Sequence, residues 1–146
     1  MQISSRFTIA LHIFTCAEVF KDDYKITSDF LASSINTNPV IIRKILSQLR
    51  NAGLITVARG PGGIEPTRPL SKITFYDVYK AVESVEDDML FHFHENPNPE
   101  CPVGRNIHNL LDDKLVAIQE AMEDKMKEYT IDNLREGIDE LLPDGK

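Results

Sequence analysis

The chain has little of several features that mark other classes of protein. Its 146 residues include no tryptophan and only two cysteines, Cys16 and Cys101, which form neither a disulfide framework nor a metal-finger pattern. The longest apolar runs fall far short of the ~20 residues that a membrane helix needs. The opening residues, MQISSRF, lack the cationic start and long apolar stretch of a secretory signal. We therefore expect a one-domain, cytoplasmic protein with reduced thiols and no membrane partner.

The residue patterns of an enzyme are missing as well. We find no nucleophile–base pair and no paired carboxylates in a signature context. The glycine-rich stretch RGPGG at residues 59–63 joins one predicted strand to another, whereas a phosphate-binding loop of a nucleotide enzyme runs from a strand into a helix. No Lys-Ser or Lys-Thr pair follows it. The sequence predicts a protein that is not an enzyme.

Positive charge is scarce overall, and it is unevenly distributed. The net charge of −7 argues, taken alone, against a nucleic-acid partner. However, residues 1–70 hold eight Lys and Arg against five Asp and Glu, and residues 71–146 hold eight against eighteen. Such asymmetry indicates two surfaces with different roles. Most of the acidic excess in the second half serves solubility.

Two short capped helices are predicted in the first half. Thr27 is a good N-cap for a helix that ends near Ile35, and a turn of about four residues follows. Asn38 caps the second helix, Pro39 takes its first position, and Gly53 supplies the left-handed stop. The second helix buries one face (Ile42, Ile45, Leu46 and Leu49) and leaves the other free (Val40, Arg43, Lys44, Ser47 and Arg50). This pattern is typical of a helix-turn-helix with a basic recognition helix.

Two strands around RGPGG follow, with alternating residues from Ile55 and from Ile64, and they predict a hairpin. Pro66 restricts the second strand to an edge position. A hairpin directly behind a recognition helix is a wing. An N-terminal helix over 3–19, apolar on two sides, and an amphipathic helix over 74–84 complete the predicted domain.

A long helix of ~25 residues, ~37 Å at 1.5 Å per residue, is predicted after a proline-rich loop. It is longer than the core of a monomer of this size can cover, so we expect it to pack against its twin in a homodimer. The predicted dimer interface comprises Ile107, Leu110, Leu111, Leu115, Ile118 and Met122. Thr130 can cap a last short helix through Leu134, and the final residues read as a frayed tail.

The predicted fold is mostly α (α+β), a winged helix-turn-helix domain plus a long C-terminal dimerisation helix. Residues 1–85 form the DNA-binding domain and 86–103 a loop. Dimerisation helices occupy 104–137, and 138–146 form a flexible tail.

The segments "LRNAGLI", "RGPGG" and "ITFYDVYKAVE", in this order, resemble the signature region of the Rrf-two family of bacterial winged-helix transcription regulators. The likeness covers about residues 1–137. It implies a homodimer with the recognition helix in a major groove and the wing in the adjacent minor groove. Several members carry an iron–sulfur cluster on three cysteines in the loop before the long helix, sometimes with a histidine just after the third.

The sequence departs from the family at this cluster. Cys101 stands about where the third cysteine would be, residues 84–100 contain no other cysteine, and Gly104 replaces the histidine. One thiolate cannot hold a cluster that needs about four ligands. We therefore expect no cofactor and no metal, and the chain is similar to a cluster-free branch of the family.

The expected DNA contacts follow from side-chain chemistry. Arg43 is the best candidate for bidentate contact to guanine, and Val40 could touch a thymine methyl. Phosphate contacts, which fix register without reading sequence, suit Arg6, Thr37, Lys44 and Arg50. Asn38 belongs to the same helix start. The wing, Arg59, Gly60, Pro61, Gly62 and Gly63, allows close backbone approach, with Arg59 entering a narrow minor groove. Alternatively the loop is a plain hairpin turn whose arginine touches only phosphate or water.

Two roles stay open for the loop before the long helix. Cys101 lies near a helix start, where the dipole lowers a thiol pKa, so it is either a redox sensor or an inert loop cysteine. His92, His94 and His108 invite a metal hypothesis, but no tight ligand pair accompanies them.

The leading hypothesis is a homodimeric transcriptional regulator, a repressor, that binds double-stranded DNA at a near-palindromic operator and responds to redox state through Cys101. The alternative is a DNA-independent protein-interaction module.

Overall fold

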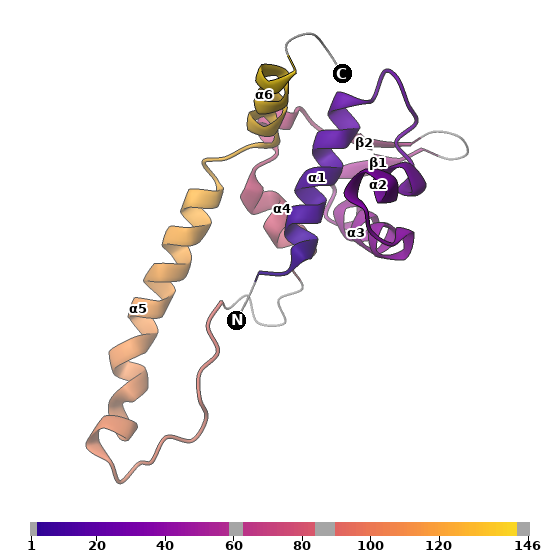
Figure 1. Ribbon diagram of the computed structural model, residues 1–146. Helices are drawn as coiled ribbons and strands as arrows, with labels where there is room; N and C mark the ends of the chain where they lie inside the picture. Colours follow the sequence, from indigo (N-terminus) through magenta and orange to yellow (C-terminus); the bar gives the residue numbers. More distant parts are fainter. Residues whose placement is uncertain (1–2, 59–62, 84–89, 143–146) are drawn as a thin grey trace.

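The computed structural model describes residues 3–58, 63–83 and 90–142. It contains six α-helices, a 3-10 turn and one two-stranded antiparallel sheet within these residues. Figure 1 shows a compact part built from α1 to α4, the sheet and α6, with α5 projecting from it as an arm. No helix within the described ranges combines the length and the apolar character needed to cross a membrane.

The compact part is organised around α1 (Ser5–Val19). Helices α2 (Ser28–Ile35), α3 (Pro39–Asn51), α4 (Phe75–Val82) and α6 (Ile131–Leu141) all contact it. Its two apolar sides are therefore both covered, as the sequence predicted. The fully buried side chains include Ile13, Phe14, Leu31, Ile42, Ile45, Leu49, Ile73, Val78 and Ile131.

The helix-turn-helix starts and stops where the sequence predicted. The Thr27 hydroxyl accepts a hydrogen bond from the Phe30 amide at 3.1 Å and so caps α2. Asn36 ends this helix in the left-handed region, with φ of 60°. The Asn38 side chain caps α3 by accepting from Val40 N at 2.8 Å. Gly53, with φ of 77°, turns the chain out of α3 into the sheet.

The sheet consists of β1 (Ile55–Val57) and β2 (Ile64–Pro66), with Ile55 opposite Pro66 and Val57 opposite Ile64. The segment before α2 binds its second strand, because Ile64 N donates to the Ile26 carbonyl at 3.1 Å. The hairpin is thus bonded to the segment that leads directly into the first helix of the helix-turn-helix.

A 3-10 turn, Leu70–Lys72, leads into α4, whose start is held by a capping box between Thr74 and Asp77. Asp77 also accepts from the Arg68 guanidinium at 2.9 Å. The segment between α5 and α6 returns to the start of α4. Phe75 N donates to the Tyr129 carbonyl at 2.9 Å and Ile131 N donates to the Ile73 carbonyl at 3.0 Å. These bonds anchor the end of the arm to the compact part.

The arm is α5, Pro102–Met126, which is 25 residues long as predicted. Its only buried side chain is Gln119, which accepts a hydrogen bond from Leu90 N at 2.8 Å. Apolar side chains on it are exposed instead, including Leu110 at 52% and Ile118 at 53%. The loop that precedes it runs beside it in the opposite direction (Figure 1).

One expectation about the C-terminus was wrong. The last helix was expected to end at Leu134, but α6 continues to Leu141. The helix persists because α6 packs against α1, and Arg135 lies 3.6 Å from Glu18 of that helix. Tertiary packing outweighs the low helix propensity of Gly137. The tail residues 143–146 lie outside the described ranges.

The close contact of Gly63 with Ile26 predicts a clear stability effect. A Cβ atom at Gly63 would lie 2.5 Å from the Ile26 carbonyl oxygen, a backbone atom that cannot swing away. We expect Gly63→Ala to lower the free energy of unfolding by about 1–3 kcal/mol, as overpacking does. Denaturant unfolding followed by circular dichroism measures this change.

Gly137→Ala is the matched control, since a Cβ there meets nothing within 4 Å. It should leave stability unchanged or raise it by up to about 1 kcal/mol, because alanine favours the helix. Equal unfolding free energies for Gly63→Ala and the wild type would contradict the packing described.

Candidate nucleic-acid interface

Helix α3 divides its side chains between the core and the surface. Ile42, Ile45 and Leu49 have no exposed surface, whereas Arg43, Lys44 and Arg50 are exposed. The buried side therefore holds the helix against α1, α2 and α4, and the basic side is left free. The two faces expected from the sequence are confirmed.

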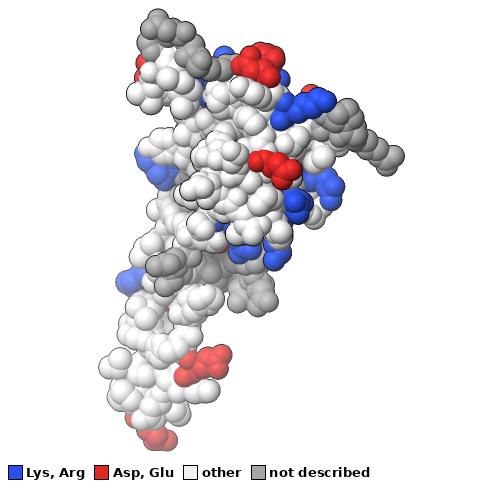
Figure 2. Space-filling view, turned by 45° about the vertical axis from the view of Figure 1, so that its right-hand side comes forward, with Lys and Arg blue, Asp and Glu red and all other residues white. Residues whose placement is uncertain are grey.

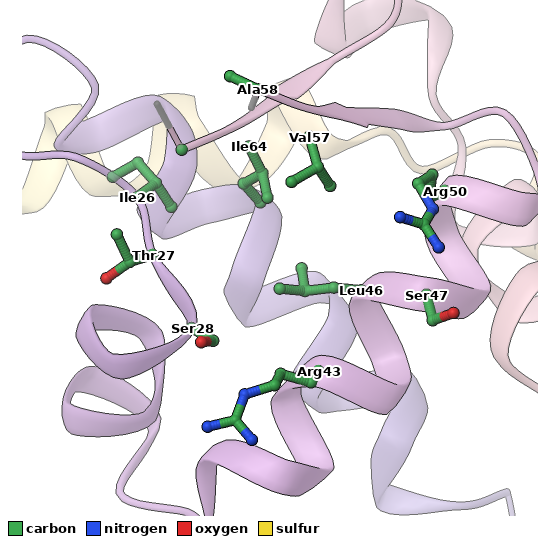
Figure 3. A pocket seen from close by; sticks show the side chains of 11 residues that line it. Ile26, Thr27, Ser28, Arg43, Leu46, Ser47, Arg50, Val57, Ala58 and Ile64 are labelled. Atoms are coloured by element: carbon green, nitrogen blue, oxygen red, sulfur yellow. The ribbon is translucent and has the colours of Figure 1, made fainter. Parts of the chain in front are cut away.

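A groove of about 430 Å³ lies beside the basic side of α3 (Figure 3). It is bounded by α3, by the start of α2 and by the hairpin. Its lining comprises Ile26, Thr27, Ser28, Arg43, Leu46, Ser47, Arg50, Val57, Ala58, Gly63 and Ile64. The arginine and hydroxyl side chains come from two different helices, so only the folded chain brings them together.

The electrostatics of the groove favour an anion. Of the described residues that line it, none is an aspartate or glutamate. Neither Arg43 nor Arg50 forms an ion pair within the described ranges. Figure 3 shows the Arg50 guanidinium below the hairpin and the Arg43 guanidinium reaching from α3 toward α2. Two unpaired guanidinium groups in an acid-free groove can bind phosphate with strong, charge-assisted hydrogen bonds.

The base of the hairpin forms one wall of this groove. Ala58 N donates to the Gly63 carbonyl at 3.2 Å, which closes the two strands toward their tip. Gly63 packs directly on Ile26, so it has a structural role here in addition to the one expected for the wing. The other wing residues predicted to bind DNA, Arg59, Gly60, Pro61 and Gly62, lie outside the described residues.

The remaining predicted DNA contacts occupy different places. Asn38 caps α3, and Thr37 is half-buried with its amide bonded to the Ala32 carbonyl. Lys44 is exposed one turn after Val40. Arg6 does not line the groove. It stands at the start of α1, where its Nε donates to the Ser4 hydroxyl at 3.3 Å.

Some groove residues were not among the predicted site residues. The sequence identified Thr27 only as a helix cap and Ser47 only as part of the free face of α3, and it assigned no role to Ser28. Hydroxyl side chains at a helix start do not by themselves indicate a binding site, because serine and threonine are common at helix starts. Their convergence on Arg43 and Arg50 depends on the crossing of α2 and α3, which the sequence does not specify.

Charge is also distributed unevenly on the folded surface. Figure 2 shows most of the visible Lys and Arg side chains on the compact part, with some acidic side chains among them, and further acidic side chains toward the far end of the arm. The described residues that line the groove include no acidic side chain. The net charge of −7 therefore does not describe the field at α3.

Cys101 lies at the other end of the arm, as the N-cap residue of α5. It is exposed, and hydrogen bonds from the backbone amides of Gly104 and Val103 lower the pKa of its thiol. The loop is packed tightly on this helix start, since a Cβ at Gly104 would lie 2.6 Å from the Asn98 carbonyl oxygen. Cys16, in contrast, is buried in the core, and burial raises the pKa of its thiol.

The histidines of this loop form a small aromatic cluster. The rings of His94 and His108 stack with centroids 6.1 Å apart, and Phe93 lies edge-on to His108 at 5.5 Å. His108 Nδ1 is 3.3 Å from a carboxylate oxygen of Asp112. His92, His94 and His108 line one hollow on the surface.

This cluster and Cys101 do not fit a metal centre. Within the residues described, no group of three or more His, Cys, Asp or Glu side chains is arranged to hold a metal ion. An iron–sulfur cluster needs about four ligands, chiefly thiolates. Cys101 is the only thiol in the loop, and Cys16 is buried among core side chains.

Comparison with known proteins agrees with the fold. The sequence model of the Rrf2 family, described as "Iron-dependent Transcriptional regulator", matches residues 3–137. The chain is 40% identical over 124 residues to YwnA of Bacillus subtilis (strain 168), named as an HTH-type transcriptional regulator. This match covers 85% of the chain and 90% of YwnA.

Solved structures share the same architecture. A crystal structure described as that of a DNA-binding protein aligns with a TM-score of 0.70 at 30% identity, over 88% of this chain and 97% of that one. CymR, the global cysteine regulator of B. subtilis, aligns with a TM-score of 0.66 at 22% identity, over 93% and 97% of the two chains. The second likeness shows the winged-helix fold alone. With a family match across residues 3–137, the chain belongs to the Rrf2 family of transcriptional regulators.

Proposed function

We propose that the protein is a homodimeric, DNA-binding transcriptional regulator that places α3 in a major groove and the hairpin over the adjacent minor groove. The observation that carries this proposal is the groove beside α3, whose described lining residues include two arginines and no acidic side chain, with neither arginine in an ion pair within the described ranges. A DNA strand that passes from the major to the minor groove would lie in it, with its phosphates against Arg50 and the hydroxyls at the start of α2. Relatives named as transcriptional regulators support the same reading.

Side-chain length and position suggest a division of roles. Arg43 can bridge to the O6 and N7 atoms of a guanine from the groove edge. Lys44, Arg50 and Thr37 suit phosphates, and we keep the expectation from the sequence that Arg6, at the start of α1, does so as well. For the wing, we keep the proposal from the sequence that Arg59 enters the minor groove.

The homodimer follows from the exposed apolar side of α5. Within the predicted interface, Leu110 and Ile118 are about half exposed, and Ile107, Leu111, Leu115 and Met122 are partly exposed. Val103 lies on the same side of α5 and adds to this surface at 61%. A second copy of α5 would cover an apolar stripe that one chain leaves in water.

A dimer of this kind would read a near-palindromic operator in the cytoplasm, with half-sites about one helical turn apart. Occupying two successive major grooves excludes other proteins from that stretch of duplex, so repression is the simplest action. The competing function is a DNA-independent interaction module built on the exposed side of α5. It would show no sequence-preferring binding to DNA.

Cys101 gives this regulator a candidate redox response. Its lowered pKa increases the thiolate fraction near neutral pH, and the thiolate is the reactive form. A peroxide would transfer one oxygen atom to the thiolate, giving a sulfenic acid and hydroxide. The sulfenic acid is larger than the thiolate and would interact differently with the backbone amides of Val103 and Gly104 at the start of α5, which would disturb the arm.

Substitution of the two groove arginines tests the DNA-binding proposal. Arg50→Ala should weaken binding to all sequences and reduce the salt slope of log K by about 1, because one phosphate contact is lost. Arg43→Ala should cost about 1–3 kcal/mol of specific binding and relax the choice at one base pair. Fluorescence anisotropy against a selected operator and its single-base variants measures both effects.

Arg105→Ala is the control, since Arg105 is an exposed arginine on α5, outside the groove. It should bind like the wild type. If the two groove variants also bind like the wild type, the groove is not the interface. The complete absence of sequence-preferring binding by the wild type would instead favour the interaction module.

A charge on the exposed side of α5 tests the dimer. Leu110→Glu should convert the protein to a monomer, because dimerisation would bury an unpaired carboxylate. Analytical ultracentrifugation gives the mass directly, and the variant should bind one half-site without cooperativity. Asn109→Glu adds the same charge one residue away and should remain a dimer. A monomeric wild type, or a dimeric Leu110→Glu, would refute the assignment of this face.

The thiol proposal predicts a difference between the two cysteines. At neutral pH, iodoacetamide should alkylate Cys101 much faster than Cys16, because the first thiol has a lowered pKa and is exposed while the second is buried with a raised one. Mass spectrometry of digested protein reads both rates. Cys101→Ser should bind DNA like the reduced wild type and ignore peroxide. A persisting peroxide response in this variant would place the switch elsewhere.

A further inference from the structure

The first turn of the recognition helix carries two apolar side chains that the core does not use. Val40 is 57% exposed and Ile41 is 41% exposed. Every other valine, leucine and isoleucine of α3 is buried at 9% exposure or less. The sequence pattern did not assign Ile41 to either face. Its exposure is a result of how α3 crosses α1 and α2.

The local structure holds these two side chains in fixed positions. Pro39 occupies the first helical position, and the Asn38 side chain accepts the Val40 amide hydrogen bond at 2.8 Å. Both residues are β-branched, so each has one strongly preferred rotamer in a helix. The apolar tip of α3, formed by Val40 and Ile41, is thus a rigid surface before any partner binds.

The surroundings of the apolar tip are cationic. Arg43 follows Val40 by three positions and Lys44 by four, so both lie next to it on the helix surface. The first turn of α3 contains no acidic residue, and the N-terminal end of a helix carries partial positive charge. An apolar protein surface would leave these charges without partners, whereas a nucleic acid supplies phosphates around its base edges.

We infer that Val40 and Ile41 determine sequence specificity by packing against the C5-methyl groups of adjacent thymines in each operator half-site. This inference rests on the proposed DNA-binding function. The thymine methyl is the one apolar group that base edges present in the major groove. A rigid apolar tip beside Arg43 and Lys44 matches that group and the phosphates on either side of it.

Two neighbouring side chains are needed to read two neighbouring bases. Successive residues of a helix point about 100° apart, so Val40 and Ile41 diverge from one another. Val40 shares a side of the helix with Lys44 and Ser47, while Ile41 lies toward Gln48. The apolar tip therefore reaches two positions along the major groove of the DNA and selects a thymine at each.

Replacing thymine by deoxyuridine tests the inference, since deoxyuridine pairs with adenine in the same way but lacks the methyl group. In vitro selection with the full-length protein first yields the preferred operator. Each thymine of a half-site is then replaced in turn, and binding is measured by fluorescence anisotropy at one salt concentration. The wild type should lose about fourfold in affinity at each of two adjacent positions, the value expected for one apolar carbon group removed from water.

The variants assign each position to a side chain. Val40→Ala should bind thymine and deoxyuridine equally at one position, and Ile41→Ala at the other. Both residues are exposed, so alanine, a better helix former, should leave the fold intact. Leu141→Ala removes another exposed apolar side chain, 77% exposed on α6, and should keep the full thymine preference.

The outcomes separate this inference from the function on which it rests. Strong selection of an operator, combined with equal binding of thymine and deoxyuridine at every position, overturns the reading of methyl groups and leaves the DNA-binding function intact. A thymine preference that survives in both alanine variants overturns the assignment to the apolar tip. Failure to select any sequence overturns the DNA-binding function itself.

Discussion

The contact between Gly63 and the backbone of Ile26 sets the geometry on which the DNA-facing surface depends. A two-stranded hairpin is marginally stable alone. Here Ile64 N donates to the Ile26 carbonyl at 3.1 Å, and the missing side chain of Gly63 lets the two backbones meet. Since Ile26 immediately precedes α2, this contact fixes the hairpin relative to the helix-turn-helix. The hairpin is therefore held in place as one wall of the groove that α3 also lines.

Electrostatic separation along the molecule explains how an acidic protein can bind a polyanion. The net charge is −7, yet the part of the groove beside α3 that the structure describes contains two arginines without an ion pair there and no acidic side chain. The acidic excess belongs to residues 71–146, which include the projecting arm. Salt screens charges separated by more than about 8–10 Å, so distant carboxylates have little effect on a phosphate seated in the groove.

The arm connects the two ends of the proposed mechanism. Its far end carries Cys101 at the helix start, and its near end is bonded to the start of α4 through Tyr129 and Ile131. Little of α5 is buried in one chain, so its position depends on what covers its apolar side. A change at Cys101 could therefore alter how two arms pack and, through α4 and α6, how two recognition helices are spaced. The redox and dimer proposals share this element.

The sequence by itself determined the helices, their caps and the hairpin, because these depend on local chemistry: Thr27, Asn38, Pro39 and Gly53 act within a few residues of their own positions. It also predicted the basic face of α3 from periodicity. It did not predict the length of α6, because the contact of that helix with α1 joins distant parts of the chain. Nor did it predict the groove or the exposure of Ile41. Whether a side chain such as Thr27, Ser47 or Ile41 faces a neighbour or water is decided by the crossing of whole helices, and that crossing is the result of packing the entire core.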